Sequence, residues 1–336
     1  MIKKIVFVGG EDVSARIEIS KKIIKEGYEV SIIGTQSEEL FNKENIEYTK
    51  YTLNRELNLF NDIRTIFELR KILKTYKNPA IIHAFDTKPT ILLPIAAVGL
   101  NNIFVTRTIT GIGRIFTDIT FKNYILKFIY EIIQKFISKY IEHTVFQNKD
   151  DEKYFLKYKL VNKANSSIIK SSGIDLKKFN SKLVNPVFNL KDVLGFKENY
   201  TTFIMVSRMV RQKGVIQYLE AAKMSIDSGA KINFILVGQL DTKKDSIKLD
   251  EILKYSNYVK YLGQRKDIKE LLSISDVFVL PTYYREGVPR VLLEASSMGL
   301  ALLATNMPGC KDVIIQGYNG EFIKIKDSTD LYHKII

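Results

Sequence analysis

Two cationic side chains lie close behind a regular apolar run in this sequence. Arg208 and Lys213 follow residues 202–206, whose β-branched and apolar composition is typical of a buried strand. A planar guanidinium group and an ammonium point charge at a strand end can together neutralise a diphosphate. The alternative is that both are exposed cations without a ligand. We favour the diphosphate because acidic residues and glycines later in the chain complement the two cations.

Two glutamates flank a proline further along the chain. Glu286 precedes Pro289, and Glu294 follows it. Proline is favoured at the first position of a helix, so the pattern predicts a helix that begins near Pro289. Glu294 then lies in the second turn of that helix, and Glu286 lies in the loop before it. Unpaired backbone N–H groups at the helix start would face the same anionic ligand as the two cations.

A pair of glycines follows the first apolar run. Gly9 and Gly10 come directly after residues 4–8, where glycine lets a backbone approach a ligand at the carboxyl end of a parallel strand. The third spaced glycine and the acidic residue of a dinucleotide fingerprint are missing, so we do not expect a nicotinamide cofactor. A P-loop lysine is missing as well.

Metal chemistry also lacks its usual ligands. No Asp-x-Asp pair stands at a predicted strand end. Cys310 is the one cysteine, and together with His83, His143 and His333 it cannot assemble a cysteine-based zinc site. A single cysteine also excludes a disulfide framework and fits a reducing cytoplasm.

The elements that must position these residues alternate regularly. Short apolar runs and longer helical patterns follow one another in both halves, which indicates parallel sheets with helices on both faces. The strand runs are 4–8, 28–33, 80–83, 202–206, 232–237, 259–262 and 277–281, and the helical patterns are 14–26, 61–76 and 216–228. A chain of 336 residues is long enough for two domains. We predict an α/β protein with doubly wound domains at 1–172 and 201–336, and a linker at 173–200.

Positive charge is in excess. Lys and Arg number 51 against 37 Asp and Glu, a net charge of +14, which points to an anionic partner. The segment from Arg114 to Tyr140 interleaves aromatic residues and lysines at helical spacing, which suits a helix on an anionic membrane surface. Alternatively, the aromatic residues pack into a core. Nucleic acid is not expected, because no binding motif accompanies the charge. The charge-free stretch 89–106 predicts a buried helix, a turn and a strand rather than a membrane span.

The chain resembles the retaining GT-B glycosyltransferases of family 4. The donor-site motif of that family is similar to Arg208, Lys213, Glu286, Gly287, Pro289 and Glu294. Other similar segments, which extend the resemblance over essentially the whole chain, contain Asn148, Gly173, Gly238, Gly309 and Asn319. The bacterial branch that adds N-acetylhexosamines or related sugars to undecaprenyl-diphosphate-linked glycans is similar at Lys88-Pro89, at 108–113 and at Phe116-Thr117.

The resemblance implies a nucleotide-sugar site in the cleft of a GT-B fold, built mainly by the C-terminal domain, with no metal and no cofactor. Arg208 and Lys213 would bind the donor diphosphate and stabilise the leaving group. Glu294 would bind the ribose hydroxyls, and Glu286 would hold the donor sugar. The other donor-side positions are Gly10, Gly238, Gly287, Val288 and Pro289. The acceptor-side positions are Lys88, Thr110 and Gly111.

The reaction that the resemblance implies uses a UDP-linked hexose or N-acetylhexosamine. The acceptor would be a polyprenyl-diphosphate-linked saccharide of surface polysaccharide or glycan synthesis, such as capsule or O-antigen. The enzyme would be cytoplasmic and peripheral at the inner face of the membrane. Two alternatives stay open: a nucleotide-sugar epimerase of GT-B-like fold, and a non-enzymatic basic protein that binds membranes or nucleic acid.

Two features depart from the family pattern. Many members carry a histidine where this chain has Thr110, so a histidine base is not expected there. Front-face attack, in which the leaving phosphate accepts the proton, does not need one. His83 ends an apolar run, and it either packs structurally or contacts the acceptor. The chain stops inside a predicted helix at 331–336, where family members continue, so we expect a truncated C-terminal domain.

Overall fold

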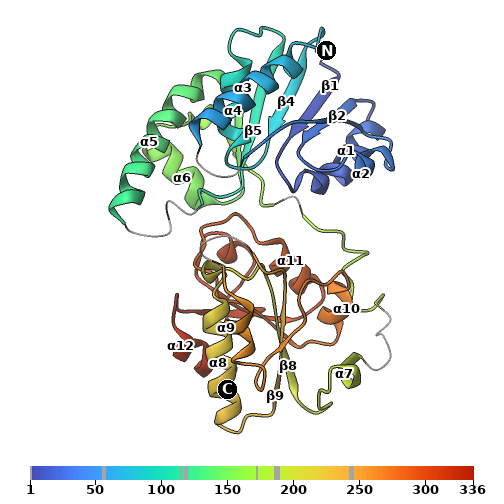
Figure 1. The fold of residues 1–336 in the computed structure, drawn as a ribbon, viewed down its shortest axis with the longest axis vertical. Coiled ribbons are helices and arrows are strands. Elements are labelled where there is room, and N and C mark those ends of the chain that lie inside the picture. The colour runs from blue at the N-terminus through green and yellow to red at the C-terminus, as the bar shows by residue number, and fades with distance from the viewer. Residues whose placement is uncertain are drawn as a thin grey trace. The chain divides into compact units, whose positions relative to one another are not determined.

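The computed structural model describes residues 2–54, 58–113, 116, 120–171, 173–184, 190–241 and 246–336. Contacts divide the chain into two compact units, Met1–Ile169 and Lys170–Ile336. Each unit contains one parallel sheet with helices packed against it (Figure 1). The segment 173–200, which we expected as a linker, falls in the second unit, where Phe179, Val184 and Leu194 are buried in the core. These three apolar residues are spaced irregularly along the sequence, so neither a helical nor a strand period predicts their burial.

The first unit is built on a parallel sheet whose strand order, in the described residues, is β3-β2-β1-β4-β5-β6-β7. The strands are β1 Lys4–Val8, β2 Glu29–Gly34, β3 Glu47–Lys50, β4 Ala80–Ala84, β5 Ile103–Ile109, β6 His143–Phe146 and β7 Ser166–Ile168. The helices are α1 Ile17–Lys25, α2 Glu39–Asn42, α3 Leu59–Leu73, α4 Pro89–Ala97, α5 Phe121–Ile137 and α6 Lys149–Lys157.

Helices cover both faces of this sheet, and the side chains of β1 alternate between two apolar clusters. Val6, Ile82 and Val105 pack with α3, α4 and α5 on one face. Phe7 and Ile32 pack with α1 and α2 on the other. A third apolar cluster packs β5 and β6 against α5 and α6. The apolar helix α4 is almost entirely buried, and β5 follows it, which confirms the helix and strand predicted for 89–106.

The second unit has a parallel sheet with the order β10-β9-β8-β11-β12-β13 in the described residues. The strands are β8 Thr201–Val206, β9 Ile232–Val237, β10 Lys260–Tyr261, β11 Val277–Leu280, β12 Ala301–Thr305 and β13 Gly320–Ile323. The helices are α7 Leu190–Val193, α8 Val215–Asp227, α9 Leu249–Leu253, α10 Ile268–Ser273, α11 Arg290–Ser297 and α12 Ser328–Ile335. Helices α8 and α12 pack on one face, and α10 and α11 pack on the other, which confirms the predicted doubly wound architecture.

A glycine fixes the turn that carries the two cations. Gly214 has a φ of +78°, and a Cβ built on it would lie 2.1 Å from the carbonyl oxygen of Pro281. The N–H of Tyr283 donates a hydrogen bond of 2.9 Å to the carbonyl of Gln212. The turn after β8 is therefore held against the loop after β11. The two backbones lie so close together that a side chain at position 214 would not fit.

We expect Gly214→Ala to destabilise the protein more than Gly229→Ala. Both glycines flank α8 with similar φ, +78° and +85°, but a Cβ on Gly229 meets no atom within 4 Å. The left-handed backbone alone costs about 1–2 kcal/mol for a residue with a Cβ. Urea unfolding of both variants measures the excess at Gly214, which comes from the contact with Pro281. Equal losses of stability would contradict that contact.

Candidate functional site

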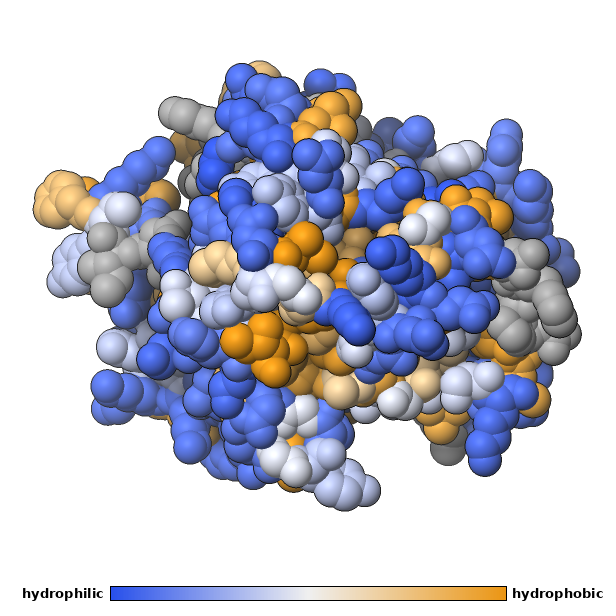
Figure 2. Space-filling view, turned by 90° about the horizontal axis from the view of Figure 1, so that it is seen from below, coloured by the Kyte–Doolittle hydropathy of each residue, from blue (hydrophilic) through white to orange (hydrophobic). Residues whose placement is uncertain are grey.

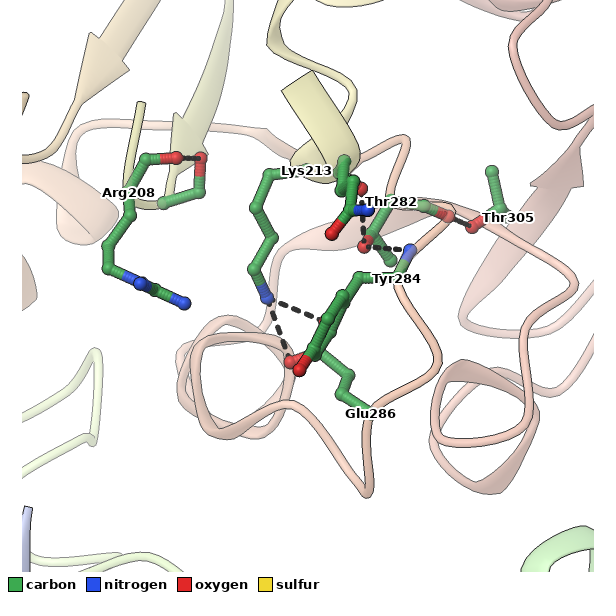
Figure 3. Close-up of polar contacts among 8 residues, drawn as sticks. Arg208, Lys213, Thr282, Tyr284, Glu286 and Thr305 are labelled. Carbon is green, nitrogen blue, oxygen red and sulfur yellow. Dashed lines mark hydrogen bonds and ion pairs between the residues drawn. The ribbon is translucent and has the colours of Figure 1, made fainter. Parts of the chain in front are cut away.

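Each cation of the turn after β8 is paired with a carboxylate of the same unit. The Nζ of Lys213 lies 2.6 and 2.8 Å from the two carboxylate oxygens of Glu286. The Nη1 of Arg208 lies 3.1 Å from Oδ2 of Asp241. The side chains of Lys213 and Glu286 are only 14% and 22% exposed, so water screens their attraction weakly. Arg208 and Lys213 extend in the same direction from the turn (Figure 3).

A hydrogen-bonded network holds Glu286 against Lys213. The Thr282 hydroxyl donates to the carbonyl of Gln212 and accepts from the N–H of Tyr284, both at 3.2 Å. The hydroxyl of Thr305 in turn donates to the carbonyl of Thr282. The Nζ of Lys213 lies 5.9 Å from the centroid of the Tyr284 ring, within reach of a cation–π interaction (Figure 3). The loop after β11 is thus tied to the turn after β8 at several points.

Helix α11 begins at Arg290, which confirms the start predicted near Pro289. Pro289 itself is the N-cap, with extended backbone. Proline fixes φ but leaves ψ open, so it can precede a helix as well as begin one. The predicted placements of Glu286 in the loop and Glu294 in the second turn are confirmed.

The loop before α11 presents backbone donors. A Cβ on Gly309 would lie 1.8 Å from the carbonyl oxygen of Gly287, so the loop packs directly on backbone. Within the described residues, no hydrogen bond is made by the backbone N–H groups of Gly287, Val288, Arg290 and Val291. N–H groups at the start of a helix favour an anionic or hydroxyl-rich ligand.

Glu294 is a largely buried carboxylate. Its side chain is 13% exposed, and its ion pair with Arg290 is long, at 3.9 Å. Burial raises the pKa of Glu294, while the positive charges of Arg290 and Lys178 act in the opposite direction. A carboxylate held in this way can accept hydrogen bonds from hydroxyl groups of a ligand.

Gly238 brings a second loop to the turn. Its φ is +149°, and a Cβ on it would lie 1.6 Å from the carbonyl oxygen of Ser207. Its N–H donates to Gly263, and its carbonyl accepts from the Tyr261 hydroxyl, both at 2.8 Å. Its backbone polar groups are therefore occupied, and its effect is to let the loop that carries Asp241 approach the Arg208 turn.

The acceptor-side positions lie in the first unit, after neighbouring strands. Lys88 directly precedes α4, and its Nζ lies 2.5 Å from a carboxylate oxygen of Asp62. Thr110 and Gly111 directly follow β5. Gly10, predicted as a donor-side position, also lies in the first unit, and its N–H donates to the carboxylate of Asp86 after β4, at 2.8 Å. Thr117 and Arg114, which the sequence also singled out, lie outside the described residues.

His83 packs as a structural residue. Its two ring nitrogens lie 2.8 Å from the hydroxyls of Thr106 and Thr108. The ring also contacts the aromatic rings of Phe7 and Phe85. Burial lowers the pKa of His83 to about 4, so the ring is neutral at physiological pH. With both nitrogens bonded, His83 has no group directed at an acceptor.

Helix α5 divides its aromatic residues between two sides. Tyr130 is buried, and Phe116, just before the helix, packs against it. The outward side of α5 is apolar, and its residues are 43–81% exposed: Phe121, Tyr124, Ile125, Phe128, Ile129, Ile132 and Phe136. Lys127 faces inward, with its Nζ 5.2–5.6 Å from the rings of Phe116, Tyr154 and Tyr158. The alternative, in which the aromatic residues pack inward, therefore holds for Phe116 and Tyr130, whereas Phe121, Tyr124, Phe128 and Phe136 are exposed.

The described residues offer neither a metal-binding cluster nor a helix that could span a membrane. Among the described residues, no three His, Cys, Asp or Glu side chains lie together as a metal site would need. In the same part of the chain, every helix is too short or too polar to cross a bilayer.

Sequence reasoning missed the carboxylate partner of Arg208. Asp241 lies three residues after Gly238, and an acidic residue just after a strand-end glycine was the available signal. It also missed Thr282 and Tyr284, whose roles depend on contacts between distant loops. The aspartate that binds Gly10 was missed as well, although it directly follows the β4 region of the sequence.

The family models that match this chain are of glycosyltransferases, and two similar relatives are glycosyltransferases as well. The model "Glycosyl transferases group 1" matches residues 187–336, and "Glycosyl transferase 4-like" matches residues 4–144. The chain is 32% identical, over 83% of its length and 72% of the relative, to N,N'-diacetylbacillosaminyl-diphospho-undecaprenol alpha-1,3-N-acetylgalactosaminyltransferase of Campylobacter jejuni. It is 30% identical, over 85% of its length and 72% of the relative, to UDP-Gal:alpha-D-GlcNAc-diphosphoundecaprenol alpha-1,3-galactosyltransferase of Escherichia coli.

Solved structures share the fold. A glycosyltransferase from Rickettsia africae superposes with a TM-score of 0.77 at 21% identity, over 99% of this chain and 87% of that one. Anabaena HepE, solved with UDP and glucose, superposes with a TM-score of 0.76 at 18% identity, over 98% and 88%. At these identities the likeness concerns the fold alone.

We expect Glu294→Gln to stabilise the protein more at pH 7 than at pH 3.5. Because burial raises the pKa of Glu294, the folded protein keeps its proton to higher pH than the unfolded chain does. Stability therefore falls as pH rises above the ordinary glutamate value of about 4.3, and glutamine removes this loss. Urea unfolding of both proteins at the two pH values measures the difference. The same increment at both would contradict an unfavourable burial of the charged carboxylate.

Proposed function

We propose the reaction of this chain from one premise: it belongs to the GT-B glycosyltransferases of group 1 and family 4, and is a hexosyltransferase that acts on lipid-linked glycans. The donor is a UDP-linked hexose or N-acetylhexosamine, and the acceptor is a polyprenyl-diphosphate-linked saccharide. The observation that carries the proposal is the Lys213–Glu286 pair beside Arg208, at the carboxyl end of β8. The transferase names of the relatives favour this reaction over an epimerase or a non-enzymatic basic protein.

The donor diphosphate binds between the two cations. Phosphate oxygens replace the Asp241 carboxylate as the partner of Arg208. They also contact Lys213, which stays paired with Glu286. The N–H groups of Gly287 and Val288 add donors without a metal ion. The cations were paired before binding, so the exchange replaces one ionic contact by another and avoids an uncompensated charge in a partly buried site.

The remaining groups place the nucleoside and the sugar. Glu294 accepts hydrogen bonds from the ribose hydroxyls, and Glu286 accepts one from a hydroxyl of the donor sugar. As the bond between the anomeric carbon and the phosphate oxygen breaks, an acceptor hydroxyl oxygen bonds to that carbon. Its proton passes to the departing phosphate, whose charge Arg208 and Lys213 stabilise. This route needs no side-chain base, which agrees with the threonine at position 110, where many family members carry a histidine.

We expect Arg208→Ala to lower kcat/KM by about 100- to 1,000-fold, the usual effect of removing one donor that stabilises developing charge. The matched control is Arg211→Ala, because Arg211 leaves the same turn but pairs with Glu251, at 2.5 Å. The assay is transfer from a panel of UDP-sugars to GlcNAc-diphosphoundecaprenol, followed by mass spectrometry. Equal effects of the two variants would refute the assignment of Arg208, and no transfer by the wild-type chain from any UDP-sugar would contradict the proposed reaction.

Peripheral binding to an anionic membrane is the second part of the proposal, and the outward side of α5 supports it. Its apolar residues suit the acyl boundary, and the exposed Lys122, Lys135 and Lys139 suit anionic headgroups. Helix α3 covers the same sheet face and has its own exposed apolar residues, of which Phe60, Ile63 and Phe67 are spaced along one side. On the face drawn in Figure 2, apolar residues lie in groups between polar ones.

Replacing Lys122, Lys135 and Lys139 by glutamine should weaken binding to vesicles that contain phosphatidylglycerol, by about 1 kcal/mol for each lysine. The control replaces the exposed Lys231, Lys260 and Lys266 of the second unit, which lowers the net charge equally. Flotation at low salt measures both. Equal losses would show that overall charge, and not α5, attracts the vesicles.

A further inference from the structure

The first sheet has a topological switch point between β1 and β4. From β1 the chain turns towards β2, and from β4 it turns towards β5, in the opposite direction along the sheet. Helix α1 packs on one face and α4 on the other, so the two loops at the carboxyl ends of β1 and β4 diverge. Ligands of open parallel sheets bind where loops diverge in this way.

Asp86 occupies this point in a strained conformation. Its φ is +67°, in the left-handed region that residues with a side chain adopt at a cost. One carboxylate oxygen, Oδ2, accepts the N–H of Gly10 at 2.8 Å, and the main-chain carbonyl accepts the N–H of Thr90 in the first turn of α4. The residue therefore links the loop after β1 to the start of α4.

The glycine pair makes room for this carboxylate. A Cβ on Gly10 would lie 3.3 Å from Oδ2 of Asp86, and one on Gly9 would lie 3.5 Å from it. The buried hydroxyl of Tyr51 donates to the carbonyl of Gly9 at 3.1 Å. Burial raises the pKa of Tyr51, and the charge of Asp86 raises it further, so Tyr51 keeps the proton that it donates. Gly10 thus serves to seat Asp86, and its N–H is already used.

The other oxygen of Asp86, Oδ1, receives no hydrogen bond from the described residues. Asp86 is only partly exposed. The hydrogen bond between Oδ2 and the N–H of Gly10 fixes the direction of the carboxylate group, and therefore of Oδ1. The neighbouring Lys88 is paired with Asp62. A carboxylate with one oxygen fixed and one unpaired, at the ligand-binding edge of a sheet, suits a hydroxyl group that donates to it.

We propose that Asp86 binds a hydroxyl of the acceptor saccharide through Oδ1, and so selects acceptors that carry a sugar over the bare lipid diphosphate. The inference rests on the proposed function, since it takes the first unit as the acceptor-binding unit. Asp86 orients the acceptor, and no proton transfer to it is required. Its strained backbone is retained because both Gly10 and α4 hold it in place.

The test compares two probes, GlcNAc-diphosphoundecaprenol and undecaprenyl diphosphate, in the same detergent micelles. The variant is Asp86→Asn, because asparagine tolerates the left-handed backbone and can still accept the N–H of Gly10. Its amide nitrogen replaces the unpaired oxygen and cannot accept a hydroxyl proton. Asp12→Asn, an exposed residue of the loop after β1, is the control for the change of charge.

We expect the wild-type chain and Asp86→Asn to have equal melting temperatures and equal affinity for UDP. The wild-type chain should bind the sugar-bearing probe about tenfold more tightly than the bare one, the scale of one hydrogen bond to a charged group. In Asp86→Asn this preference should disappear, and in Asp12→Asn it should remain. As a second variant, Gly10→Ala should also reduce it, because the added Cβ pushes Oδ2 away.

Different failures have different meanings. A preference that is unchanged in Asp86→Asn would overturn the role of Asp86 and leave the proposed function intact. A wild-type chain that binds UDP but does not distinguish the probes would also overturn it. A wild-type chain that binds neither probe would overturn both this inference and the proposed acceptor class.

Discussion

The ion pair between Lys213 and Glu286 is the interaction around which the candidate site of the second unit is arranged. An unpaired charge in a partly buried site costs free energy, and this pair forms because the turn after β8 meets the loop after β11. Gly214 permits that contact because it has no side chain, and the hydroxyl of Thr282 fastens it. The fold therefore holds paired cations at the end of β8, and an anionic ligand can join or replace their carboxylate partners. The proposal that this unit binds a nucleotide diphosphate rests on that property.

Most strands inside the two sheets were predicted because they are buried on both faces, although β6 and β12 were missed. Strands β1, β4, β8, β9 and β11 are short, nearly continuous apolar runs, which is what a parallel sheet requires. The edge strand β3 was not, since Glu47–Lys50 has charged residues at both ends and one buried side chain. The site followed the same division. Residue types and spacing correctly predicted that Glu286 lies in a loop and Glu294 in the helix that follows it. The pairing of Arg208 with Asp241, by contrast, arises from two loops that only the tertiary fold brings together.

The first unit shows a related limit. Helical periodicity identified α5 as amphipathic, but it could not tell which of its residues face outward. Lys127, which looked equivalent to Lys122, lies over three aromatic rings and joins α5 to its neighbours. Gly10 is a second case, because a glycine after a strand suggests space for a ligand, and here that space holds the carboxylate of Asp86. In both cases, contacts between elements decide whether a residue faces a ligand or packs against the rest of the protein.

A crystal structure of the chain with bound UDP would show directly whether the turn after β8 binds the donor diphosphate. We expect diphosphate oxygens within hydrogen-bond distance of Lys213 Nζ and of the Arg208 guanidinium, with Arg208 released from Asp241 and the ribose hydroxyls at Glu294. UDP bound elsewhere in the molecule, with the pairs Lys213–Glu286 and Arg208–Asp241 both intact, would contradict it.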